Sequence, residues 1–322
     1  MNLEKEPLVS IIIINYNGKQ YLEKCLQSIE QINYNNYEIF LVDNNSTDNS
    51  VDFVEKNFPN INVIKLDKNY GFAKPNNIAA KQSKGNLFYF LNNDTRICPN
   101  SLSELVNALN NPDIAIGQSL LLKENNDVDS SGDYITKMGL AYSSTKKEDK
   151  VKPILSARGA SMIIKKEVFW NLGGFDSKFF ASFEDVDLGW RAWISGYKVV
   201  LVPTSIVYHL GGATTKELES EINFHGVKNT LILCLTNFEL PYSIQSIYSL
   251  FKLTLNNFFF HPDPVKLYDV KFKMPQSGSI VKAIVWIIKN FRYVIKKRNQ
   301  VKSTRVISTK ELFESGLIQD LK

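Results

Sequence analysis

The sequence predicts an α/β protein in which helices cover both faces of a mostly parallel sheet. Three observations indicate this fold: short apolar runs recur along the first two hundred residues, amphipathic stretches separate them, and turns rich in Asn, Asp and Gly follow them. Beyond about Phe238 the alternation ends and helical patterns dominate, which predicts a helical C-terminal extension. The length of 322 residues allows one large domain or two modest ones.

The first part of the chain contains four expected strands, each followed by an expected helix. The strands are short apolar runs that would be buried between helices: Val9–Ile14, Ile39–Val42, Ile61–Leu66 and Leu87–Leu91. Apolar residues at helical spacing predict the helices: Tyr21–Ile29, Val51–Phe58, Ile78–Gln82 and Leu102–Leu109. The fourth helix has Pro99 near its start, where proline is favoured.

A polar segment, Lys123–Lys152, then interrupts the pattern. Its Ser, Asp and Lys residues predict a mobile surface loop with a short hairpin, which is either a functional lid or a solvated insertion. Apolar elements return after it: a strand at Met162–Ile164, a helix at Asp185–Ile194 and a strand at Val199–Val202.

The composition excludes several classes of protein. Hydrophobic residues make up 44% and charged residues 22%, which is typical of a soluble globular chain and not of a disordered, collagenous or coiled-coil one. No apolar run approaches the roughly 20 residues of a membrane-spanning helix, and no signal sequence is evident, so a cytoplasmic protein is expected. Three distant cysteines argue against a disulfide framework or a zinc site. A net charge of +5 is too small to indicate nucleic acid, so no nucleic-acid partner is expected.

Polar side chains follow each of the first four expected strands. Ligands of doubly wound sheets bind at the carboxyl ends of the strands, so these groups would converge on one edge and could hold the hydroxyls, base and phosphates of a nucleotide. Alternatively, each of them only shapes a turn or caps a helix. Four consecutive polar strand ends favour binding. The residues at these positions include Asn15, Tyr16, Asp43, Asn69, Asn93 and Asp94.

Common catalytic motifs are missing from the sequence. It has no GxGxxG after the first strand, no GxxxxGK[ST], no HExxH and no GxSxG, so the chemistry must come from carboxylates, amides and a metal. Asp94 is the best candidate metal ligand, because Mg²⁺ and Mn²⁺ take one or two carboxylates together with substrate phosphate oxygens. The alternative for Asp94 is a helix cap before Pro99.

A second cluster of acidic residues stands at the start of the helix Asp185–Ile194. Glu184, Asp187 and Arg191 can share one face, so Arg191 could neutralise either acid and fix the helix. Asp185 lies about 100° around the helix from its neighbours and can point into the cleft as a general base. Stabilisation of a helix start by its dipole is the structural alternative. His209 has two glycines close after it, Gly211 and Gly212, and is either a ligand or a structural histidine.

Together these segments resemble the family 2 glycosyltransferases, which are inverting enzymes of the GT-A fold. The resemblance runs from Val9 to about Thr215, and the closest likeness is to the rhamnosyltransferase-like branch that extends bacterial surface polysaccharides. Basic residues around Arg298–Leu312 also resemble that branch. Six motifs carry the resemblance, in this order: VSIIIINYNG, VDNNSTDNS, NYGFAKPNN, LNNDT, GGFDSKFFASFEDVDLGWR and VYHLGG.

The resemblance implies a role for each candidate residue. Asp185 would be the catalytic base and Glu184 would orient the acceptor or support the loop. Asp94 and His209 would hold Mn²⁺ or Mg²⁺ on the donor diphosphate. The nucleotide-sugar pocket would be formed by Asn15, Tyr16, Asp43, Asn69, Asn77, Asn93 and Asp94.

The sequence departs from the family pattern at two positions. The metal motif Asn92-Asn93-Asp94 has one acid where many relatives have two, and Lys74-Pro75 stands where small residues are common. The single acid motivates one alternative, a catalytically silent sugar-nucleotide or glycan-binding homologue, although Asp185 and His209 are retained. A nucleotidyltransferase is a further alternative, but Asn15-Tyr16-Asn17-Gly18 lacks the basic glycine-rich loop such enzymes use for triphosphates.

The expected partners are a dTDP- or UDP-linked sugar donor and a glycan or lipid-linked oligosaccharide acceptor. We expect a GT-A domain over residues 1–235 and a helical extension over 236–322. Within the extension, Ile280–Arg298 predicts a single basic amphipathic helix, with Lys282, Lys289 and Lys296 recurring every seven residues. It would bind an anionic membrane surface, placing the protein on the cytoplasmic face of the plasma membrane, or pack on the catalytic domain. Val227–Leu235 and Ile244–Phe260 would form a helical hairpin or a homodimer contact.

Overall fold

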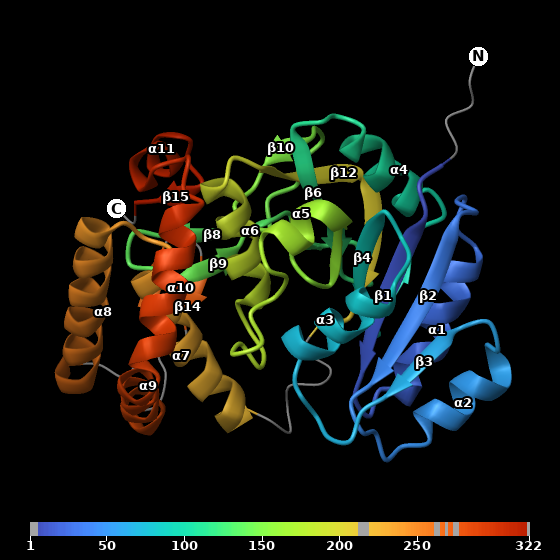
Figure 1. Ribbon diagram of the computed structural model, residues 1–322, viewed down its shortest axis with the longest axis horizontal. Helices are drawn as coiled ribbons and strands as arrows, with labels where there is room; N and C mark the ends of the chain where they lie inside the picture. Colours follow the sequence, from blue (N-terminus) through green and yellow to red (C-terminus); the bar gives the residue numbers. More distant parts are fainter. Residues whose placement is uncertain (1–5, 212–218, 261–264, 268–269, 273–276, 321–322) are drawn as a thin grey trace.

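A mostly parallel sheet between two layers of helices organises the molecule (Figure 1). The computed structural model describes residues 6–211, 219–260, 265–267, 270–272 and 277–320. In these ranges the main sheet has ten strands, of which eight lie side by side in one continuous order. The other two are β5 (Thr95–Ile97), which pairs with β12, and β7 (Val128–Ser130), which pairs with β6. The continuous order is β10 (Lys152–Pro153), β12 (Lys198–His209), β6 (Ile114–Leu122), β11 (Ser161–Lys165), β4 (Leu87–Asn92), β1 (Val9–Asn15), β2 (Tyr37–Asp43) and β3 (Asn62–Lys65).

The strand directions bring several carboxyl ends to one edge. β1 is parallel to β2 and β4, β2 is parallel to β3, and β6 is parallel to β12. β11 is antiparallel to both β4 and β6, so β6 and β12 run in the same direction as β1. The chain leaves β1 toward β2 on one side and returns to β4 on the other. The ends of β1 and β4 therefore flank the switch point at which open α/β sheets bind ligands.

The sheet separates two apolar clusters. Ile11 and Ile13 of β1 point into one cluster and Ile12 into the other, as the alternation of a strand requires. Burying each such side chain stabilises the fold by roughly 1.5–3 kcal/mol. On the Ile11 face lie α1 (Lys19–Glu30), α2 (Ser50–Asn57) and α4 (Ser101–Leu109). On the Ile12 face lie α3 (Ala73–Gln82), α5 (Lys166–Asn171) and α6 (Glu184–Ile194).

The predicted helical extension is present, and it packs beside α6 at the end of the molecule opposite β3 (Figure 1). Ile232 and Leu233 belong to the same apolar cluster as Val301 and Leu312, so this cluster spans the expected boundary at residue 235. No described helix is long and apolar enough to cross a bilayer. The described elements of the extension are α7 (Glu219–Thr236), α8 (Leu240–Phe260), β13 (Val265–Leu267), β14 (Val270–Phe272), α9 (Ser277–Lys289), α10 (Phe291–Ser303), α11 (Thr309–Glu314) and β15 (Ile318–Gln319).

The structure corrects the predicted surface loop at Lys123–Lys152. Part of this segment forms β7, followed by the hairpin of β8 (Asp133–Thr136) and β9 (Ala141–Ser143), and β15 pairs with β8. All four residues of β8 are buried. The short hairpin was predicted, but a mobile surface loop is wrong for residues 128–143, because their few apolar side chains pack inward.

The single helix expected at Ile280–Arg298 is also wrong, since the segment forms α9 and α10 with a break at Asn290. Asn290 lies between the two helices as the residue that precedes α10, and its side-chain amide donates to the Trp286 carbonyl of α9 (2.9 Å). The expected apolar face is split as well: Val294 is buried against the core, whereas Ile288 and Phe291 are exposed.

Candidate active site

Three strand ends meet in a hydrogen-bonded group around Asn15, the last residue of β1. The Asn15 amide nitrogen donates to Asp43 Oδ1 at the end of β2 (3.2 Å), and its Oδ1 accepts from the Asn93 amide just beyond β4 (2.8 Å). All three side chains are buried. Gly18 closes over them, because a Cβ there would lie 2.1 Å from Asn93 Nδ2. The structure thus brings together three of the predicted donor-binding residues.

The loop after β3 forms the next part of this edge. Asn69 Oδ1 accepts the N–H of Gly71 (2.8 Å), and the Asn44 amide donates to the Gly71 carbonyl (2.7 Å). Gly71 has φ +76°, and a Cβ there would lie 1.9 Å from the Phe180 carbonyl oxygen. Asn69 therefore shapes this loop, while Tyr16 is partly exposed just beyond β1.

Asp94 and His209 lie together at the same edge, where β4 and β12 end. Asp94 Oδ1 is 3.5 Å from His209 Nε2, and Asp129 Oδ2 is 2.9 Å from His209 Nδ1. Burial alone would lower the pKa of His209, but the hydrogen bonds and charges of Asp129 and Asp94 outweigh it and raise the pKa to about 9. The imidazole is thus held between two carboxylates in a site that favours positive charge.

This donor set fits a divalent cation in part. Asp94 and His209 are nearly buried, and Asp129 is placed to orient the ring from its other nitrogen, as outer-shell carboxylates do at metal sites. In the described part of the chain, no group of three or more His, Cys, Asp or Glu residues is arranged to hold a metal by itself. Oxygens of a bound diphosphate would have to complete the coordination.

Asp185 stands in the first turn of α6, on the side that faces Gly159. Its Oδ2 accepts the N–H of Gly159 (3.0 Å) and its Oδ1 accepts that of Val186 (2.8 Å). Burial, together with the charge of Asp133, outweighs these hydrogen bonds and raises the pKa of Asp185 to about 6. A carboxylate with such a pKa is ionised at neutral pH and is a stronger base than an ordinary aspartate.

Glu184 has a different environment from Asp185. It is 6% exposed, and its Oε2 has no hydrogen-bond partner among the described residues. Burial and the neighbouring charge of Asp185 raise the pKa of Glu184 well above its ordinary value. Its burial, with no hydrogen bond to Oε2 among the described residues, suits a supporting role at the start of α6.

Asp187 and Arg191 tie α6 to its surroundings. Arg191 Nε donates to Asp187 Oδ2 (2.8 Å), and the guanidinium also donates to the carbonyls of Leu172 and Gly174. Asp187 Oδ1 lies 2.9 Å from Lys297 Nζ on α10. Arg191 thus pairs with Asp187, and this fully buried carboxylate links the helix of Asp185 to the C-terminal extension.

A strained loop presents this helix. Ser182 and Phe183 both have φ +70°, a left-handed conformation that is rare for a bulky residue such as phenylalanine. From α7, the Asn229 amide donates to the carbonyls of Ala181 (3.0 Å) and Ser182 (2.6 Å), and Lys228 Nζ donates to that of Lys178 (2.6 Å). These bonds hold the unfavourable backbone that places Glu184 and Asp185 at the start of α6.

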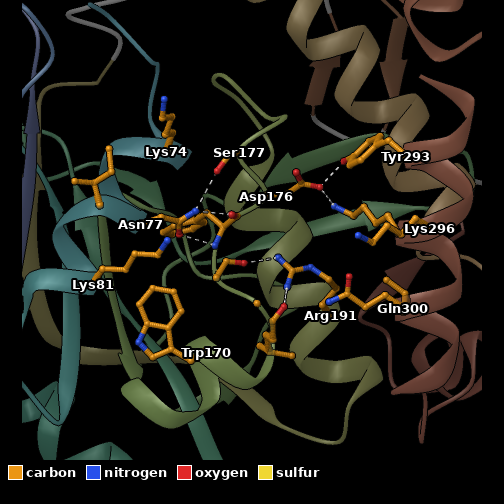
Figure 2. Close-up of a pocket in the computed structure, with 17 residues that line it drawn as sticks. Lys74, Asn77, Lys81, Trp170, Asp176, Ser177, Arg191, Tyr293, Lys296 and Gln300 are labelled. Carbon is orange, nitrogen blue, oxygen red and sulfur yellow. Dashed lines mark hydrogen bonds and ion pairs between the residues drawn. The ribbon is translucent and has the colours of Figure 1, made fainter. Parts of the chain in front are cut away.

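Asn77 does not join the other predicted donor residues. Its amide donates to the Phe175 carbonyl (2.7 Å) and accepts the Phe175 N–H (3.0 Å). It lines a cavity of about 600 Å³ whose lining includes none of the other predicted donor residues (Figure 2). In the free protein the Asn77 side chain therefore fixes the backbone of the 174–177 loop.

Two charged residues of the site were missed from the sequence. Arg158 donates to Asp129 Oδ2 (3.1 Å) and lies 3.5 Å from Asp133 Oδ1, next to the Gly159 N–H that binds Asp185. Arg158 and Asp129 thus connect the surroundings of Asp185 to His209. The signal that could have found Arg158 is a single charge within the otherwise uncharged run Ile154–Ile164.

The last motif of the resemblance is described only in part, since Gly212 and the following residues to 218 lie outside the described residues. His209, at the end of β12, is described. The N–H of Leu210 donates to the Asp94 carbonyl (3.1 Å), which fixes the two strand ends to each other.

Comparisons with known proteins agree on a family. The model described as "Glycosyl transferase family 2" matches residues 10–173. The O-antigen biosynthesis protein RfbC of Myxococcus xanthus is 32% identical over 224 residues, which are 63% of this chain and 17% of that protein. The N-acetylglucosaminyl-diphospho-decaprenol L-rhamnosyltransferase of Mycobacterium tuberculosis is 22% identical over 252 residues, 68% of this chain and 81% of that protein. The chain thus spans only a sixth of the first relative.

Solved structures share the fold. TarS of S. aureus (residues 1–349), in complex with UDP-GlcNAc, has a TM-score of 0.56 at 17% identity, over 96% of this chain and 92% of that one. A mannosyltransferase of Pyrobaculum calidifontis, in complex with GDP-Man and Mn²⁺, has a TM-score of 0.55 at 16% identity, over 90% and 76%. The predicted GT-A fold is confirmed by these neighbours and by the mainly parallel sheet.

Proposed function

The chain belongs to glycosyl transferase family 2, and from this premise we propose that it is an inverting glycosyltransferase of cell-surface polysaccharide synthesis. Its donor is a dTDP- or UDP-linked sugar, with rhamnose as the first candidate, and its acceptor is a hydroxyl of a glycan or a lipid-linked glycan. Relatives named for O-antigen biosynthesis and for rhamnosyl transfer support this choice. The observation that carries the proposal is Asp185, a carboxylate whose pKa is raised to about 6 and which the segment of Gly159, Arg158 and Asp129 connects to His209 at the end of β12.

In the proposed reaction, Asp185 accepts the proton of the acceptor hydroxyl while that oxygen bonds to the anomeric carbon. The bond from this carbon to the nucleoside diphosphate breaks on the opposite side, so the configuration inverts and no covalent enzyme intermediate forms. Asn15, Asp43 and Asn93 hold the nucleotide, with Tyr16 and Asn69 beside them. A divalent cation held by Asp94 and His209 would neutralise charge on the diphosphate.

A panel of nucleoside-diphosphate sugars tests the proposal directly. The protein should release the nucleoside diphosphate from one donor when a suitable acceptor is present, and NMR should show the product with the opposite anomeric configuration. A folded sample that binds these donors without transfer would favour the silent homologue instead. Release of pyrophosphate from a nucleoside triphosphate and a sugar phosphate would identify a nucleotidyltransferase.

We also propose that the extension holds the protein at the cytoplasmic face of an anionic membrane. Four apolar residues of α8 lie on one face and are 59–64% exposed, and a second exposed apolar group lies on α9 and α10. Exposed basic residues of the second group would meet the anionic lipid phosphates. The α8 residues are Leu240, Ile244, Tyr248 and Phe251; the second group includes Ile284, Ile288, Phe291 and Ile295; its basic residues are Lys282, Lys289, Arg292 and Lys296.

Vesicle sedimentation separates this proposal from a homodimer formed through the same face. The double variant Ile288→Asp/Phe291→Asp should be released from anionic vesicles, whereas Val306→Asp, at a 70% exposed apolar residue outside both groups, should stay bound. Equal retention of all three proteins would refute membrane binding. If the wild-type protein is a dimer in solution and the double variant Ile288→Asp/Phe291→Asp is a monomer, the face is a subunit contact.

A further inference from the structure

A basic cavity lies between α3 and α10, and its lining includes none of the strand-end residues Asn15, Asp43, Asn93 and Asp94. It has a volume of about 600 Å³, and its walls come from one face of α3, the loop after α5 and one face of α10. Figure 2 shows Lys74 and Lys81 on one side, Lys296 and Gln300 on the other, and Trp170 at the base. None of these side chains has a role in the proposed transfer reaction.

The charges that line this cavity are strongly unbalanced. Asp176 is the one carboxylate among its described lining residues, against five cationic side chains. Asp176 is already engaged, since it accepts from Lys297 Nζ (2.5 Å) and from the Tyr293 hydroxyl. The positive charges of Arg191 and Lys297 are also compensated, because both side chains form ion pairs with Asp187.

Three lysines remain on the two facing walls. Lys81 and Lys296 are exposed and form no ion pair with any described residue. Lys74 lies with its Nζ 3.3 Å from the centre of the Tyr70 ring and likewise forms no ion pair with an acid in the described ranges. Holding like charges around one cavity is unfavourable unless an anion joins them.

The polar groups beside these lysines suit an oxygen-rich ligand. Ser177 is exposed at the rim, and its hydroxyl hydrogen is free to donate because its oxygen accepts from the Asn77 amide (3.3 Å). Trp170 adds a flat apolar wall, fixed by edge-to-face contacts with Phe88 and Phe169. Lysine ammonium groups and a hydroxyl donor are typical ligands of phosphate oxygens.

We propose that this cavity is a second ligand site, which binds a phosphate- or diphosphate-bearing anion between α3 and α10. The bound anion would join α3 of the sheet domain to α10 of the C-terminal extension. The phosphate comes either from a soluble molecule or from a lipid headgroup, since α10 also carries the exposed Phe291 and Ile295. The proposal does not depend on the transferase assignment.

Binding of inorganic pyrophosphate to the full chain tests this proposal. EDTA is present throughout, so that metal-dependent binding at the strand ends is suppressed. Trp170 fluorescence reports on the cavity, with Trp170→Phe as the blank, and calorimetry gives the affinity. The test variant is Lys81→Gln/Lys296→Gln, and the matched control is Lys24→Gln/Lys56→Gln, which removes two exposed lysines of α1 and α2.

Pyrophosphate should change the Trp170 signal, and its affinity should fall about tenfold or more in the test variant but stay unchanged in the control. A wild-type protein with no Trp170 response at millimolar pyrophosphate would overturn the proposal. Equal affinity in the test variant and the wild type would also overturn it. Phosphatidic acid vesicles that displace pyrophosphate would support a lipid source, whereas pyrophosphate retained against them would support a soluble one.

Discussion

Replacing Asn229 by alanine should damage the geometry around Asp185 without touching any reacting group. The substitution removes two hydrogen bonds, to the carbonyls of Ala181 and Ser182. At a net 0.5–1.5 kcal/mol each, their loss should lower the free energy of unfolding by about 2 kcal/mol. The left-handed backbone of Phe183 holds strain energy of about 1–3 kcal/mol. Without the two hydrogen bonds, this strain favours relaxation of the loop.

Relaxation would move the start of α6, and with it the Asp185 carboxylate. A displacement of about 1 Å at a reacting group can reduce the rate 100-fold, so kcat should fall by roughly 10- to 100-fold while the donor KM changes much less. Urea unfolding gives the stability and a coupled assay of nucleoside diphosphate release gives kcat.

Ser246→Ala is the matched control for Asn229→Ala. Ser246 lies on α8, and its buried hydroxyl donates to Cys234, which is on α7 like Asn229 but away from the 181–183 loop. The substitution removes this hydrogen bond. It should lower stability by about 1 kcal/mol and leave kcat unchanged. Wild-type kcat in Asn229→Ala, at a stability as low as predicted, would show that the loop keeps its geometry without this amide and would refute the reasoning.

Three further predictions concern the charged groups of the site. Because the pKa of Asp185 is raised to about 6, kcat/KM should fall tenfold per pH unit below pH 6 as the base is protonated, and a pH profile flat down to pH 5 would contradict this. Asp94→Ala and His209→Ala should each weaken Mn²⁺-dependent donor binding at least tenfold by calorimetry, and undiminished Mn²⁺ dependence would remove them as ligands. Glu184→Gln should keep kcat within about threefold, since glutamine preserves the size of this buried side chain and burial raises the pKa of Glu184, which disfavours its charged form; a loss as large as that of an Asp185 variant would assign Glu184 a charged role.

The sequence was most informative where function depends on consecutive residues. The apolar runs located β1, β2, β3 and β4 to within two residues, because each is a short strand bounded by polar turns. The expectation that all four would be buried is wrong for β3, which lies at the edge of the sheet with its residues exposed or partly exposed. The turns after β1, β2 and β4 then placed Asn15, Asp43 and Asp94 at one edge, which parallel topology alone requires.

The missed features depend on contacts between distant segments. β6 was not predicted, because Gly117 and Gln118 interrupt its apolar run, although both lie within the sheet. Arg158 and Asp129 are 29 residues apart, and nothing in either neighbourhood indicates that they meet. Asn77 follows the family motif in sequence, yet its amide is used by the backbone of Phe175.

The most direct test of the account is the variant Asp185→Asn. It keeps the size of the side chain and removes the base, so transfer should fall by about 10²–10⁴-fold, while calorimetry should show donor affinity within a few-fold of wild type. Near-normal turnover in the folded variant would contradict the assignment of Asp185 as the base and, with it, the mechanism proposed here.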